Sequence, residues 1–162
     1  MIKPEELGKL AAKKRPENKV FFSRLSRYDK RKLDELFHDL HAEVFEQTDC
    51  LACANCCKSL GPRITDADIR RVSKSLHIKP SQFTDDFLRI DEDGDYVFKS
   101  MPCPFLQSDN RCRIYDDRPA ACREYPHTNR PRMYQVLDLT KRNIETCTAV
   151  FSIVEMMKQK LD

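Results

Sequence analysis

Glycine is scarce in this sequence, and tryptophan is absent. The three glycines, Gly8, Gly61 and Gly94, lie far apart along the chain. A phosphate-binding or dinucleotide-binding loop needs glycines close together, because its backbone has to approach the phosphates. The sequence therefore gives no support to a conventional nucleotide site or to an S-adenosylmethionine site of the Rossmann type.

Long hydrophobic runs are also missing. The first residues, Met1 to Glu6, lack the apolar stretch of a secretory signal. No run approaches the ~20 apolar residues of a membrane span. We therefore expect a cytoplasmic protein that has no membrane partner. In such a reducing compartment, clustered cysteines indicate metal or redox sites rather than disulfides.

Charges of the two signs are mixed along the chain, with 29 basic and 26 acidic residues and a net charge of +3. Basic residues gather only in short runs, such as Lys13, Lys14 and Arg15. Modules that bind nucleic acid usually carry a longer basic stripe on one face. We expect no nucleic-acid partner, and the sequence does not identify a protein partner or substrate.

The chain length and periodicity predict a mostly α fold with minor β, in which an irregular cysteine-rich centre packs between helices. With 162 residues the chain can bury a substantial core without help from its cysteines. Apolar periodicity, capping residues and prolines predict helices over the approximate ranges 4–16, 28–47, 66–76, 81–88 and 143–161. Thr65 and Asp68 are spaced as a capping box at the start of the third of these. The Asp93-Gly94 pair predicts a hairpin turn, and Met133–Leu139 is predicted as a strand.

The eight cysteines are the main functional feature of the sequence. Four form a tight cluster with the spacing C-x2-C-x2-C-C, and four follow at a distance: Cys50, Cys53, Cys56, Cys57, Cys103, Cys112, Cys122 and Cys147. A C-x2-C-x2-C run is used by iron–sulfur clusters, whose further cysteine often precedes proline, as Cys103 does here. The spacing predicts that all eight thiols are metal ligands.

A disulfide framework is the alternative for an even number of cysteines. The adjacent pair Cys56 and Cys57 argues against it, because neighbouring cysteines tend to serve two different partners. Spacing alone leaves the metal open: eight thiolates can close two zinc sites, or four can hold one [4Fe–4S] cluster. The tight run favours the iron–sulfur cluster.

The segment from Cys112 to His127 is rich in arginine and proline. We expect Asp117 to cap a turn that begins at Arg118 and leads to Cys122. Arg118 and Arg123 are then near enough to offset thiolate charge. Surface ion pairs are the alternative role for these two arginines.

These motifs together resemble a known family. C-x2-C-x2-C-C at Cys50–Cys57, C-P-F-L at Cys103–Leu106, C-x-I-Y-x-x-R-P-x-x-C-R-x-Y-P at Cys112–Pro126, and the late Cys147 are similar to the YkgJ-like cysteine-cluster family. The resemblance covers roughly residues 50–151. It implies a domain that chelates zinc or iron and that is related to part of flagellin lysine-N-methylase.

The sequence therefore predicts a metal-binding protein with a cysteine-ligated iron–sulfur or zinc centre and a redox or electron-transfer role. We expect residues 1–48 to form a helical extension and residues 49–162 to form the cysteine-cluster domain, as one compact unit. Two alternatives are a methyltransferase-like or maturation enzyme that uses the metal, and a zinc-stapled interaction module. No catalytic residue is identified from the sequence.

Overall fold

The computed structural model of the chain describes residues 2–161. The chain forms two compact units: unit 1 is Met1–Cys53 with Pro126–Asp162, and unit 2 is Ala54–Tyr125. The predicted fold class, mostly α with minor β, is confirmed. The division into 1–48 and 49–162 stays a prediction. No helix within residues 2–161 has the length and apolar character needed to cross a membrane.

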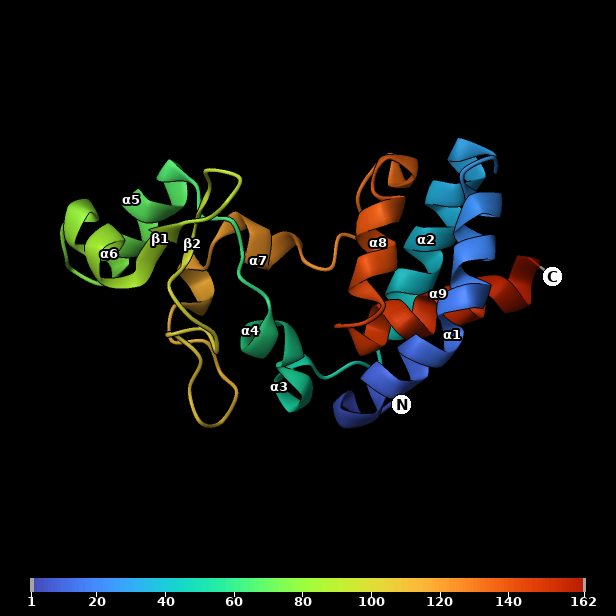
Figure 1. Ribbon diagram of the computed structural model, residues 1–162, viewed down its shortest axis with the longest axis horizontal. Helices are drawn as coiled ribbons and strands as arrows, with labels where there is room; N and C mark the ends of the chain where they lie inside the picture. The colour runs from blue at the N-terminus through green and yellow to red at the C-terminus, as the bar shows by residue number, and fades with distance from the viewer. Residues whose placement is uncertain (1, 162) are drawn as a thin grey trace. The chain divides into compact units, whose positions relative to one another are not determined.

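Unit 1 is built from helices at both ends of the chain (Figure 1). Its elements are α1 (Pro4–Leu25), α2 (Lys30–Phe45), the single turn α3 (Cys50–Cys53), the 3₁₀ turn η2 (Met133–Gln135), α8 (Leu137–Asn143) and α9 (Thr148–Leu161). Helix α9 packs against α1, α2 and α8. Fully buried side chains of α2 and α9, such as Phe37 and Val154, fill the core between them.

Helix α1 is longer than the sequence predicts, because it continues through Pro16 to Leu25. A proline inside a helix removes a hydrogen bond and costs about 3 kcal/mol. The residues after Pro16 offset this cost: Phe21 and Leu25 are buried in the core of unit 1. The buried ammonium of Lys158 in α9 also contacts Glu17 at 2.6 Å. The predicted end of this helix near Pro16 is therefore wrong.

The predicted strand Met133–Leu139 is also wrong. Asp34 of α2 accepts hydrogen bonds from the amides of Arg132 and Met133, both at 2.8 Å. Arg132 takes the left-handed conformation there, with φ 62°. This local bend is incompatible with an extended strand, and the segment forms η2 and the start of α8 instead.

The predicted C-terminal helix 143–161 is only partly right, because two helices meet in that range. Helix α8 ends at Asn143, and α9 begins at Thr148. The amides of Glu145 and Thr146 bond to carbonyls three residues earlier, which tightens the chain and ends α8. Cys147 lies in the short connection that results.

Unit 2 contains shorter elements around its own apolar core (Figure 1). They are α4 (Asn55–Ser59), α5 (Asp66–Ser75), α6 (Pro80–Phe87), β1 (Leu88–Ile90), β2 (Tyr96–Phe98), the 3₁₀ turn η1 (Tyr115–Asp117) and α7 (Ala120–Glu124). Strands β1 and β2 pair antiparallel, with Arg89 opposite Val97. The predicted hairpin and the helices at 66–76 and 81–88 are thus confirmed within two residues.

Phenylalanine rings in mutual contact form the centre of the unit 2 core. The ring of Phe83 in α6 lies 5.4 Å from that of Phe87 and 6.3 Å from that of Phe105, measured between centroids. Phe83 is fully buried. This cluster joins α6 to the loop that carries the later cysteines of the unit.

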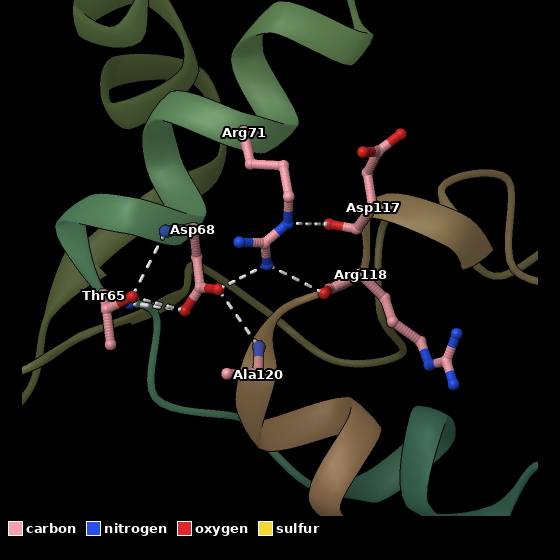
Figure 2. A network of polar contacts seen from close by, with 6 residues as sticks. All are labelled: Thr65, Asp68, Arg71, Asp117, Arg118 and Ala120. Carbon is pink, nitrogen blue, oxygen red and sulfur yellow. Dashed lines mark hydrogen bonds and ion pairs between the residues drawn. The ribbon is translucent and has the colours of Figure 1, made fainter.

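Helix α5 begins with the predicted capping box. The amide of Asp68 donates to the Thr65 hydroxyl, and the Thr65 amide donates to the Asp68 carboxylate at 2.9 Å. Asp68 is 1% exposed, and its other oxygen accepts from Arg71 at 2.6 Å and from the Ala120 amide at 3.0 Å (Figure 2). Burial raises the pKa of Asp68, but these hydrogen bonds outweigh burial and hold the pKa below its usual value.

We expect Phe83→Ala to lower the free energy of unfolding of unit 2 by about 3–5 kcal/mol, because it leaves a cavity in a closed aromatic cluster. Ile90→Ala is the matched control in the same unit, since Ile90 is 61% exposed. Its effect should stay within about 0.5 kcal/mol. Urea unfolding followed by circular dichroism measures both, and equal effects would contradict this account of the core.

Asp68→Asn should lower the free energy of unfolding at neutral pH by about 1–3 kcal/mol, because it weakens hydrogen bonds to a buried charge. The folded-state pKa of Asp68 lies below the unfolded-state value, so the carboxylate stabilises the fold fully above the unfolded-state pKa. That contribution is lost as the pH falls through the folded-state pKa. The gap between wild type and Asp68→Asn should therefore be constant near neutral pH and shrink below about pH 4.

The exposed Asp66 in the first turn of the same helix provides the control. Asp66→Asn should change the unfolding free energy little at any of these pH values. Chemical denaturation at a series of pH values measures all three proteins. A gap for Asp68→Asn that stays constant into acid would show that the ionised carboxylate is not what stabilises the fold.

Candidate metal centre

The first two cysteines share one helical turn in unit 1. Asp49 starts this turn, because its carboxylate accepts from the amides of Leu51 and Ala52 at 2.9 and 3.3 Å. Cys50 and Cys53 are the ends of α3 and lie three residues apart. This spacing places both thiols on the same face of the turn.

Ala54 separates these two thiols from the next pair. Its φ of 47° lies in the left-handed region, which costs a residue with a Cβ atom about 1–2 kcal/mol. The helical path therefore stops after Cys53, and Cys56 and Cys57 belong to the separate helix α4. The sequence-contiguous C-x2-C-x2-C run is thus divided between the two units.

Backbone pairing brings Cys57, Cys103 and Cys112 together in unit 2. The amide of Cys103 donates to the carbonyl oxygen of Cys57 at 2.8 Å. Leu106 and Cys112 form an isolated antiparallel bridge. Cys103 and Cys112 also pack against the apolar core of the unit.

Cys122 is the fourth thiol of this group and lies in α7. Its amide donates to the carbonyl oxygen of Pro119 at 2.9 Å. Pro119, rather than Asp117, precedes the first helical residue, and Asp117 instead closes the 3₁₀ turn η1. The predicted capping role of Asp117 is therefore wrong, whereas the placement of Cys122 in a short helical turn is right.

Electrostatic coupling shows that these four thiols are close to one another. Burial, together with charge on Cys103, Cys57 and Cys112, raises the pKa of Cys122 to about 12. Burial likewise raises the pKa of Cys103 to about 11, with contributions from Cys112 and Cys57. The pKa of Cys112 is also raised, chiefly by burial. A thiolate on any one of them makes ionisation of the others harder.

Cys57 has the opposite tendency. The hydrogen bond from the adjacent Cys56 thiol, with the two Sγ atoms 4.0 Å apart, lowers the pKa of Cys57 to about 7. Burial opposes this effect, and the Lys58 ammonium contributes to it. Cys57 is therefore the most readily ionised of these four thiols.

Cys147 joins Cys50 and Cys53 in unit 1. Burial raises the pKa of Cys147 to about 11, and charge on Cys50 and Cys53 adds to the increase. The residue next to it, Thr148, lines a hollow of about 200 Å³ together with Thr48, which lies two residues before Cys50. Three of the predicted ligands are therefore grouped in this unit.

Arg118 supplies positive charge beside the unit 2 thiols. Its guanidinium opposes the increase in the pKa of both Cys112 and Cys122. The same group donates to the Tyr115 carbonyl oxygen at 2.6 Å and lies 3.8 Å from the centre of the Tyr115 ring. The predicted charge-offsetting role of Arg118 is thus supported by position, and that of Arg123 stays a prediction.

The donor set of unit 2 matches a thiolate metal centre in kind, because four cysteines are the ligand set of both closed zinc sites and [4Fe–4S] clusters. The side chains do not converge on a single point, however. Within residues 2–161, no three His, Cys, Asp or Glu side chains are arranged so that they could hold one metal ion as they stand.

Sequence reasoning missed the side chains that hold the loop between Cys112 and Cys122. Arg71 donates to the carbonyl oxygens of Asp117 and Arg118, at 3.4 and 3.0 Å, and Asp68 accepts from the Ala120 amide (Figure 2). The capping box identified Asp68 as a helix start. Nothing local in the sequence indicates its contact with a residue 52 positions away.

Comparison with known proteins agrees with the cysteine geometry. The model of the CxxCxxCC family, described as "Putative zinc- or iron-chelating domain", matches residues 49–148, a range that includes all eight cysteines. Neither the curated proteins nor the solved structures yield a match. Since the family model covers more than half of the chain, the resemblance drawn from the motifs is confirmed, and the chain belongs to the CxxCxxCC family of zinc- or iron-chelating domains.

Proposed function

We propose that this chain is a metal-binding protein whose main centre is held by Cys57, Cys103, Cys112 and Cys122. The observation that carries the proposal is that four thiols from separate segments of unit 2 influence one another's ionisation. The backbones of Cys57 and Cys103 are hydrogen-bonded, and Cys103 and Cys112 pack against the apolar core of the unit. The family description supports metal binding in general. The grouping of the four thiols supports the further proposal that these residues are the metal ligands.

We further propose that the centre is a [4Fe–4S] cluster with a redox or electron-transfer role. A zinc ion needs four sulfur atoms at ~2.3 Å from one point. In a [4Fe–4S] cluster each thiolate binds a different iron atom, so the four sulfurs stay farther apart. Thiols that interact without converging, as in unit 2, suit the wider arrangement better.

Cys50, Cys53 and Cys147 are proposed as a second and separate ligand set in unit 1. This second set is supported by the effect of charge on Cys50 and Cys53, the two thiols of α3, on the pKa of Cys147. Three protein ligands leave one coordination position for a further ligand, as in zinc sites that keep an open position. The methyltransferase-like alternative rests on the family resemblance alone.

Protein purified without oxygen should be brown and should contain iron and sulfide, with a visible absorption that bleaches on reduction. Elemental analysis and visible spectroscopy measure these properties. A colourless protein with stoichiometric zinc would contradict the cluster and favour the zinc-stapled interaction module. A protein with neither metal would contradict metal binding itself.

Serine variants test which thiols share the unit 2 centre. Cys57→Ser, Cys103→Ser, Cys112→Ser and Cys122→Ser should each remove the same metal signal, and any double variant should lose no more than a single one. This non-additivity is expected because the four thiols act on one centre. Metal content per chain and the visible spectrum give the measurement.

Cys147→Ser is the matched control, because it removes a half-buried thiol of unit 1. It should leave the unit 2 signal unchanged and reduce only the remaining metal. The proposal fails if Cys147→Ser abolishes the same signal, or if one of the four variants keeps it. In the same assay, loss of the signal in Cys56→Ser would add Cys56 to the unit 2 ligands, and retention would leave it outside.

A further inference from the structure

The chain between Cys112 and Cys122 has little regular structure of its own. It contains only the 3₁₀ turn η1 and the start of α7. A loop of this kind is normally among the more mobile parts of a protein. If nothing else fixed it, the metal would have to order the loop when it binds, and that cost would reduce the affinity.

Two side chains of α5 hold this loop by its backbone. Arg71 donates to the carbonyl oxygens of Asp117 and Arg118, and Asp68 accepts from the amide of Ala120 (Figure 2). The three contacts cover almost consecutive residues and end two positions before Cys122. Because they use backbone atoms only, they fix the path of the chain and leave its side chains free.

The side chains of Asp68 and Arg71 are themselves fixed by hydrogen bonds. Arg71 donates to Asp68 at 2.6 Å, and the second oxygen of Asp68 accepts from the Thr65 hydroxyl at 2.7 Å and from the Thr65 amide at 2.9 Å. Asp68 is almost fully buried, so water cannot replace a lost partner. Val72, one residue after Arg71, is buried in the core of unit 2. The loop is therefore anchored through α5 to the core of unit 2.

The anchor also orients the positive charge beside the thiols. While its carbonyl oxygen is held by Arg71, the Arg118 side chain extends away from α5, as Figure 2 shows, and contacts Tyr115. From there its charge acts on Cys112 and Cys122. The anchor thus fixes two predicted ligands and the cation that accompanies them.

We propose that Asp68 and Arg71 are positioning residues of the unit 2 centre, an inference that rests on the proposed function. They hold the backbone of residues 117–120, so that Cys112 and Cys122 are placed for metal binding before the metal binds. They do not touch the metal. Supporting groups of this kind typically alter metal affinity by about 10–100-fold when they are lost.

Cobalt(II) provides the probe, because its charge-transfer and d–d absorption reports both thiolate ligation and geometry. The full-length reduced protein is titrated with cobalt(II) alone, and zinc competition then gives the affinity. Arg71→Gln removes the two loop contacts that Arg71 makes. Arg70→Gln is its matched control, because Arg70 is exposed on the neighbouring position of the same helix.

Ala120→Pro is the second variant: it replaces the amide hydrogen that bonds to Asp68 with a ring carbon and leaves Arg71 intact. Proline is tolerated at the first position of a helix, which Ala120 occupies in α7. The preceding Pro119, with φ −51° and ψ 148°, already has the extended conformation that a following proline requires. Ala120→Ser, which keeps the amide hydrogen, is the matched control. Circular dichroism checks that each variant is folded.

We expect Arg71→Gln and Ala120→Pro to bind cobalt(II) about 10–100-fold more weakly than their controls and to change its absorption spectrum. A merely structural role would lower stability but leave the affinity and spectrum of the folded variants at the control values, and that result would overturn the inference. If Arg71→Gln does not fold, Ala120→Pro decides the question alone.

Failure of the proposed function looks different from failure of this inference. If wild type binds neither cobalt(II) nor an iron–sulfur cluster, or if Cys122→Ser keeps the full thiolate-to-cobalt absorption, the unit 2 centre itself is wrong, and the inference falls with it. If wild type binds through Cys122 and the variants match their controls, only the positioning role is wrong. Cobalt bound by the unit 1 thiols should be the same in every variant and control.

Discussion

The buried carboxylate of Asp68 is the interaction on which the irregular half of unit 2 depends. One of its oxygens completes the cap of α5 through Thr65, and the other binds Arg71 and the Ala120 amide. A buried charge that loses a partner is strongly destabilising, so none of these contacts is dispensable. The start of a regular helix and the path of a cysteine-bearing loop are therefore fixed together by one side chain.

The backbone conformation of Ala54 is the second constraint, because it separates the cysteines of unit 1 from those of unit 2. In the C-x2-C-x2-C run, Cys50, Cys53 and Cys56 are evenly spaced, so the sequence alone gives no reason to assign them to different sites. The left-handed conformation of Ala54 ends α3 and sends the chain into another compact unit. Thiols that are neighbours in the sequence thus acquire different neighbours in space, and Cys57 meets Cys103 instead. The unit 2 thiols therefore come from distant segments of the chain rather than from the contiguous run.

Sequence reasoning succeeded where the determining contacts are local and failed where they are distant. The Thr65–Asp68 cap and the Asp93-Gly94 hairpin depend on residues a few positions apart, and both were predicted correctly. The false strand at 133–139 arose because its amides bind Asp34, almost a hundred residues earlier. The list of candidate ligands followed from spacing. Their division into sets and the Asp68–Ala120 contact did not, because both depend on tertiary packing.

Charge explains why the unit 2 thiols need both a fixed backbone and a cation. Each thiolate makes ionisation of the next harder in these half-buried surroundings, and Arg118 contributes a single positive charge. A metal centre adds positive charge at the sulfur atoms themselves and can hold coordinating thiols deprotonated. A metal centre does not determine which segments of the chain lie beside it. Asp68 and Arg71 determine which segment lies there, because they bond to the carbonyl oxygens of residues 117 and 118 and to the amide of residue 120. They do not bind the Arg118 side chain, whose charge acts on the thiols. Backbone position and sulfur charge are thus controlled by separate groups, and a change in one need not disturb the other.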